Sequence, residues 1–156
     1  MRRLLIAVAF LAAYACDNGA SSAPAITAAC ARSFHAVLEA WETRLGRVPD
    51  ECALLDTRYT VSVVTEDVLA AACEPDAPDD VIGGCTQPDA RTILVLGGRP
   101  EIDQVDSAVH EWVHALADCA SGAPDNDHLR GELWGIYGAE TIETQAQAAA
   151  QIGACL

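Results

Sequence analysis

The chain has 156 residues, of which 51% are hydrophobic, and it carries a net charge of −14 with no lysine. This length and composition suffice to bury the core of one ordinary globular domain and leave no room for several. So acidic a surface repels phosphate backbones, which argues against nucleic acid as a partner.

The N-terminus has the pattern of an export segment. Two arginines precede an apolar run over residues 4–13, and residues 13–15 form a small-residue cleavage site of the A-x-A kind. The apolar run is too short to remain as a transmembrane helix. We therefore predict a signal peptide over residues 1–15 and a flexible tether over residues 16–25.

Cleavage after residue 15 would leave Cys16 at the mature N-terminus. The segment resembles the lipobox of bacterial lipoproteins, in which this cysteine is acylated, although Ala13 stands where that family usually has leucine. The resemblance implies an exported protein of the bacterial cell envelope, tethered in the periplasm or at the cell surface by a lipid on Cys16. The alternative is a simply secreted protein in which Cys16 is free or paired.

Hydrophobic periodicity predicts the first elements of the mature domain. Apolar residues recur at helical spacing over residues 26–45, which predicts a long helix that packs on the core. Two runs rich in β-branched and aliphatic residues, residues 58–65 and 91–96, predict strands. A short helix over residues 68–73 and an acidic loop over residues 74–84 are expected between them.

A second amphipathic helix begins near Pro100 and is ended by Gly122 and Pro124. A last, alanine-rich helix is expected over residues 139–154. Together these elements predict a small α+β domain over residues 26–156, in which a short β-sheet is accompanied by an N-terminal helix, a central helix and a C-terminal helix.

The chain contains seven cysteines. Without Cys16 an even number remains, which suits three disulfides in an oxidising compartment. Their spacing is too irregular for a metal-binding knuckle. Proximity in sequence favours Cys73 with Cys85, and the other pairings stay open among Cys30, Cys52, Cys119 and Cys155.

The second amphipathic helix carries the sequence His110-Glu111-Trp112-Val113-His114, an H-E-x-x-H motif. Residues four apart project from the same face of a helix, so the imidazoles of His110 and His114 can bind one Zn²⁺. Glu111 then lies beside the metal and can take a proton from a metal-activated water. We therefore predict that Glu111 is a general base.

With this motif on a helix that follows a strand, the chain resembles the zincin metallopeptidases over about half of its mature length. In that superfamily the two motif histidines bind zinc, the glutamate is the general base, and another protein ligand comes from further along the chain. The resemblance implies a zinc-dependent metallopeptidase acting on a protein or peptide, with His110, His114 and Glu111 in these roles. The alternative is a non-catalytic zinc-binding surface lipoprotein that serves as a binding or structural module.

The third ligand is not fixed by the motif. The long metzincin motif requires glycine at position 117 and histidine at position 120, where this chain has alanine. We predict His128, because the polar loop after the motif helix is long enough to return to its histidines. The chemically acceptable alternatives are Glu140, Glu143, Asp127 and Glu132.

Neighbouring side chains are candidates to support this site. Asp125 or Asp127 could orient a ligand imidazole, and Asp118 could hold the second nitrogen of His114. Tyr137 is a candidate hydrogen-bond donor to the oxyanion that forms during hydrolysis.

Overall fold

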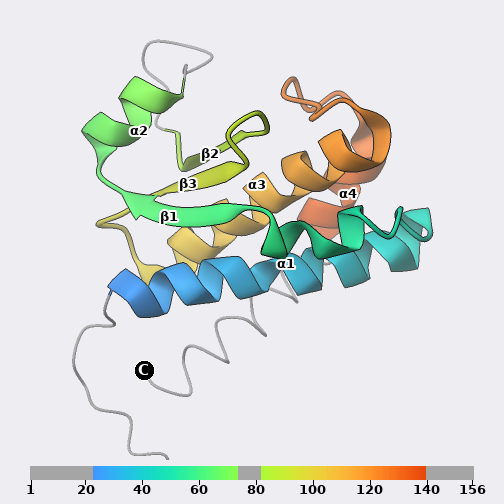
Figure 1. The fold of residues 1–156 in the computed structure, drawn as a ribbon, viewed down its shortest axis with the longest axis horizontal. Helices are drawn as coiled ribbons and strands as arrows, with labels where there is room; N and C mark the ends of the chain where they lie inside the picture. Colours follow the sequence, from blue (N-terminus) through green and yellow to red (C-terminus); the bar gives the residue numbers. More distant parts are fainter. Residues whose placement is uncertain (1–22, 74–81, 140–156) are drawn as a thin grey trace, which may run out of the picture.

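A three-stranded mixed sheet lies at the centre of the fold (Figure 1). Strands β1 (Thr60–Val64) and β3 (Thr92–Leu96) run parallel, and β2 (Gly84–Gln87) pairs antiparallel with β3 at the other edge. The strand order is therefore β1-β3-β2. The sequence analysis predicted β1 and β3 and missed β2, because Gly-Cys-Thr-Gln has neither a β-branched run nor an alternating pattern.

This computed structural model describes residues 23–73 and 82–139, and of residues 23–25 and 136–139 only the backbone. Its helices and short mixed sheet confirm the predicted small α+β domain. The predicted signal peptide, Cys16 and nearly all of the predicted last helix lie outside the described residues. None of the helices that the structure describes is long and apolar enough to cross a membrane.

Helices cover both faces of the sheet. Helices α1 (Ala23–Leu45) and α3 (Glu101–Ser121) pack on one face, and α2 (Glu66–Ala72) packs on the other. In Figure 1 the sheet accordingly lies between α1 and α2. All three helices were predicted, α1 and α3 from apolar periodicity, with bounds that differ by a few residues.

The side chains of β3 explain this layering. Ile93 and Val95 are fully buried on the face covered by α1 and α3, whereas Leu94 and Leu96 pack in the smaller cluster around α2. Successive residues of a strand point to opposite faces, so one apolar strand can serve both clusters.

Helix α3 is fixed to α1 by the tryptophan of its motif. The Trp112 side chain is fully buried, its ring centroid lies 4.9 Å from that of Phe34, and its indole N–H donates to the Cys30 carbonyl oxygen at 2.9 Å. Gly122, with φ of +74°, ends the helix as predicted, since glycine adopts this left-handed conformation without steric cost. The motif is therefore carried on a rigid element.

The sequence analysis missed a helix, α4 (Gly131–Ala139), which carries Trp134 and ends where the predicted last helix begins. Its glycines at positions 131, 135 and 138 lower the intrinsic helix propensity, which hides the helix from sequence analysis. Tertiary contacts compensate, since the Leu133 side chain is fully buried. A 3₁₀ helix, η1 (Cys52–Thr57), lies between α1 and β1.

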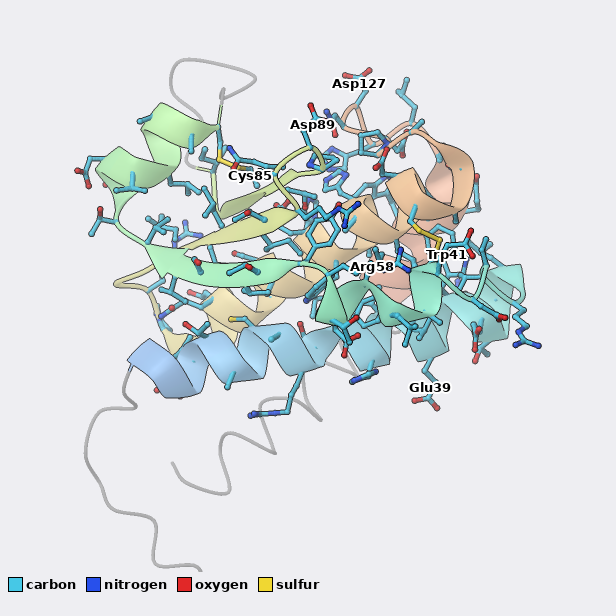
Figure 2. The ribbon with its side chains drawn as sticks, viewed as in Figure 1. Glu39, Trp41, Arg58, Cys85, Asp89 and Asp127 are labelled. Carbon is cyan, nitrogen blue, oxygen red and sulfur yellow. A yellow bond between two sulfur atoms is a disulfide. The ribbon has the colours of Figure 1, made fainter. Side chains whose placement is uncertain are left out.

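Two disulfides join elements of the described structure. The predicted bond between Cys73 and Cys85 is confirmed, and it links the end of α2 to β2 (Figure 2). A second bond joins Cys52 of η1 to Cys119 of α3. Among the described cysteines, Cys30 is buried without a disulfide partner, and Cys155 lies outside the described residues. Two disulfides are typical of an oxidising compartment.

Candidate metal centre

Three imidazoles meet at one end of the cleft between β2 and α3. His110 and His114 come from successive turns of α3, and His128 comes from the loop between α3 and α4. The Nε2 atom of His110 lies 3.1 Å from Nε2 of His114 and 3.1 Å from Nε2 of His128. All three possible ligand atoms lie within 4.8 Å of one another, so the three residues could hold a metal ion.

The loop after α3 turns back to bring His128 to the motif. Asp125 and His128 both adopt left-handed backbone conformations, with φ of +56° and +54°. A turn forms between them, in which the His128 N–H donates to the Asp125 carbonyl oxygen at 3.0 Å. The sequence predicted that this loop could return; its path depends on two unusual backbone conformations.

Of the alternative third ligands, the two that the structure describes, Asp127 and Glu132, do not belong to this cluster of possible metal ligands. Asp127 is exposed and points outward at the top of Figure 2. Glu132 is exposed and pairs with Arg130, whose Nε lies 3.1 Å from its Oε1. Glu140 and Glu143 lie outside the described residues.

Hydrogen bonding sets the tautomer of His114. Its Nδ1 lies 2.6 Å from the Pro124 carbonyl oxygen, which can only accept a hydrogen bond, so Nδ1 carries the proton. Nε2 then presents its lone pair to His110 and His128. The orienting partner is thus a backbone oxygen and not Asp118, and the proline predicted to end the helix supplies it.

The environment keeps the imidazoles of α3 neutral. Burial, with a further contribution from His114 and His128, lowers the pKa of His110 to about 3. Burial also lowers the pKa of His114, against the opposing effect of its hydrogen bond to Pro124. At neutral pH both residues are therefore in the form that binds metals.

Glu111 is buried under β2, with only 5% of its surface exposed. The Thr86 hydroxyl lies 3.0 Å from its Oε2 and 2.8 Å from its backbone oxygen, so its single hydrogen is shared between them. Burial raises the pKa of Glu111 to about 7, although the hydrogen bonds of Thr86 act in the opposite direction. The sequence analysis missed Thr86, since nothing in the sequence around it signals a strand.

A cleft of about 500 Å³ runs between β2, α3 and the His128 loop. Glu111 and the three histidines line it, together with every residue of β2. The Leu96 N–H donates to the Gly83 oxygen, so in the antiparallel register the backbone groups of Gly84 and Thr86 point away from β3. The cleft is therefore bordered by the unpaired edge of β2, at which the Thr86 backbone N–H is directed to Glu111.

Trp134 of α4 forms an aromatic wall against all three histidines. Its ring centroid lies 4.8 Å from those of His110 and His114 and 4.1 Å from that of His128. Nothing in the sequence indicates this role beyond an aromatic residue shortly after a histidine-bearing loop. The side chain of Tyr137, the candidate oxyanion donor, lies outside the described residues.

Comparisons with protein-family models, curated proteins and solved structures find no match to this chain. The assignment of a function therefore depends on the chemistry of this site.

Proposed function

We propose that the protein is a zinc-dependent metallopeptidase in which His110, His114 and His128 bind the metal and Glu111 is the general base. The observation that carries the proposal is the buried Glu111 carboxylate, which lines the same cleft as the three imidazoles. Burying an acid is unfavourable for folding, and a purely structural metal site does not need one beside its ligands. This favours an enzyme over the non-catalytic binding module.

The donor set supports zinc. Three neutral imidazoles with an open fourth position are a common set for catalytic zinc, and nitrogens at ideal tetrahedral positions would be about 3.3 Å apart. The two 3.1 Å separations from Nε2 of His110 are close to this value, and since all three ligand atoms lie within 4.8 Å of one another, a small approach of His114 and His128 would complete the set. When bound, Zn²⁺ lowers the pKa of a water molecule and polarises the substrate carbonyl.

The residues of the chain supply the proton transfers. Glu111 takes a proton from the attacking water as the new carbon–oxygen bond forms, and returns it to the amine nitrogen as the peptide bond breaks. A pKa of about 7 suits both steps near neutral pH. The Thr86 hydroxyl holds the carboxylate in place between β2 and α3.

The free edge of β2 supports a protein or peptide substrate. An extended peptide can add to an exposed strand edge through main-chain hydrogen bonds. The outward backbone groups of Gly84 and the outward carbonyl of Thr86 border the same cleft as Glu111, to which the Thr86 N–H is directed. A peptide that pairs with them would lie across the site.

The disulfides of the domain agree with the predicted export of the protein. The two disulfides favour an oxidising compartment outside the cytoplasm. Membrane attachment through a lipid on Cys16, in the bacterial periplasm or at the cell surface, stays a prediction of the sequence.

The test is a Glu111→Gln variant of the mature protein. We expect it to keep one zinc per chain in native mass spectrometry and to lose at least about 100-fold in hydrolysis of an unfolded protein substrate, the usual contribution of a general base. Asp103→Asn, which changes an exposed carboxylate on the same helix, should behave as the wild type. Equal hydrolysis by Glu111→Gln and wild type would refute the base, and a zinc-loaded wild type that hydrolyses no peptide would favour the binding module.

A further inference from the structure

Asp125 connects the aromatic wall of the metal site to the loop that carries His128. Its Oδ2 accepts hydrogen bonds from the Trp134 indole N–H at 2.7 Å and from the Arg130 backbone N–H at 3.0 Å. Its Oδ1 accepts one from the Leu129 backbone N–H at 3.3 Å. One carboxylate therefore fixes both the tryptophan and the backbone that immediately follows His128.

The loop needs such a restraint. Left-handed backbone conformations are unfavourable for residues other than glycine, and this loop contains two, at Asp125 and His128. They persist only where surrounding contacts hold them. Besides Asp125, the Arg130 guanidinium ties the loop to the end of α3 through a hydrogen bond of 2.8 Å from Nη1 to the Ser121 hydroxyl.

Trp134 transmits the restraint to the imidazoles. Its ring contacts His128 edge-on and lies against His110 and His114 on α3. Its N–H is directed to Asp125, so rotating the ring would break a short hydrogen bond. With the ring fixed, His128 is held between a rigid aromatic surface and the two histidines of the motif.

We propose that Asp125 is a positioning residue of the metal site, which holds His128 in the ligand set through Trp134 and the backbone of the turn. This inference rests on the metal-binding part of the proposed function and does not depend on hydrolysis. Asp125 does not line the cleft and makes no hydrogen bond to an Nε2 atom, so apart from the attraction between its charge and His114 it acts through Trp134 and the backbone of the turn. Removing it should leave the two motif histidines in place and release the third.

Asp127 provides a matched control. It carries the same charge on the same loop, is exposed, and makes no hydrogen bond or ion pair with the residues that the structure describes. Asp127→Ala removes the same charge from the same loop and none of these contacts, whereas Asp125→Ala also removes the charge beside His114 and places alanine in a left-handed conformation. Asp125→Asn keeps an acceptor oxygen and is the conservative variant.

The experiment measures Zn²⁺ affinity by competition with a chelator, together with the visible absorption of the Co²⁺-substituted proteins. We expect Asp125→Ala to bind Zn²⁺ about 10–100-fold more weakly than wild type, the usual effect of removing an orienting partner. Its Co²⁺ spectrum should shift toward that of His128→Ala. Asp125→Asn should recover part of the affinity, and Asp127→Ala should match the wild type.

Thermal unfolding of the metal-free proteins shows which variants are folded. If Asp125→Ala does not fold, Trp134→Phe serves instead, because it removes the N–H donor and keeps an aromatic ring, although a smaller one, against the histidines; we expect an intermediate loss of affinity and a shifted Co²⁺ spectrum. Wild-type affinity, or a wild-type Co²⁺ spectrum in a folded Asp125 variant, would overturn the proposal. A wild type that binds zinc without hydrolysing peptides would overturn the peptidase alone, whereas a wild type that binds no metal would overturn both.

Discussion

Glu111 shows a conflict between function and stability at the scale of one residue. Burial raises its pKa from the ordinary 4.5 to about 7, so the folded protein binds this proton more tightly than the unfolded chain does. The folded state is therefore destabilised as pH rises from about 4.5 to about 7, and the loss is complete above that range. The proposed role as a general base gives a reason for an acid at this costly position.

This conflict predicts a pH-dependent effect of Glu111→Gln on the metal-free protein. Glutamine has a similar shape and no charge to bury, so the variant should be more stable than wild type by about 3 kcal/mol at pH 8 and by about 1 kcal/mol at pH 5. Urea unfolding in the presence of a chelator measures both differences. The same difference at the two pH values would show that the carboxylate does not titrate in this range.

The sequence predicted the candidate metal ligands and the candidate base, but it did not predict the residues that position these side chains. His110, Glu111 and His114 follow from a motif, and His128 from the reach of a loop. Their partners do not, because contacts of Thr86 with Glu111, of Pro124 with His114 and of Trp134 with the histidines join segments distant in sequence. No local pattern encodes such contacts.

At the scale of elements, the site depends on how closely β2 approaches α3. Gly84 makes this approach possible, since a Cβ there would lie 2.7 Å from the Leu94 carbonyl oxygen and 3.1 Å from Cγ of Glu111. The first contact is with backbone, which cannot rotate away. The strand that positions Thr86 therefore requires glycine two residues earlier.

Gly84→Ala should displace β2 from the backbone of β3 and from Glu111 on α3. We expect a loss of about 1–3 kcal/mol in the free energy of unfolding, typical of overpacking, and reduced hydrolysis because Thr86 moves from Glu111. Gly131→Ala is the control: its Cβ would meet no atom within 4 Å, and alanine favours the helix that begins there. Denaturant unfolding compares the two. An unchanged Gly84→Ala protein would mean that the strand can shift without effect on the site.

The elements that could be predicted are those in which the pattern of apolar residues matches the pattern of burial in the fold. Helices α1 and α3 show a clear apolar stripe, and β3 is a continuous aliphatic run buried on both faces. Strand β2 and helix α4 show neither pattern. The first is a strand because it pairs with β3, and the second contains glycines and is held by contacts of Leu133 and Trp134.

At the scale of the whole molecule, the two disulfides serve different parts of the fold. The bond between Cys52 and Cys119 joins residues 67 apart in sequence and ties η1 to the last turns of α3. The bond between Cys73 and Cys85 joins residues 12 apart and lies directly beside the strand that carries Thr86. The bond between Cys52 and Cys119 constrains more of the unfolded chain. The bond between Cys73 and Cys85 lies closer to the candidate metal centre, because Cys85 lies in β2.

Removing each disulfide in turn should therefore give opposite rankings for stability and activity. Loop-closure entropy predicts a loss of about 4 kcal/mol for the double variant Cys52→Ser with Cys119→Ser, and about 3 kcal/mol for Cys73→Ser with Cys85→Ser. Under conditions where both variants are folded, hydrolysis should fall more in the second, because β2 is freed from α2 at the residue before Thr86. Urea unfolding and peptidase assays on the two double variants measure both rankings. Equal hydrolysis by the two folded variants would mean that pairing with β3 alone positions β2.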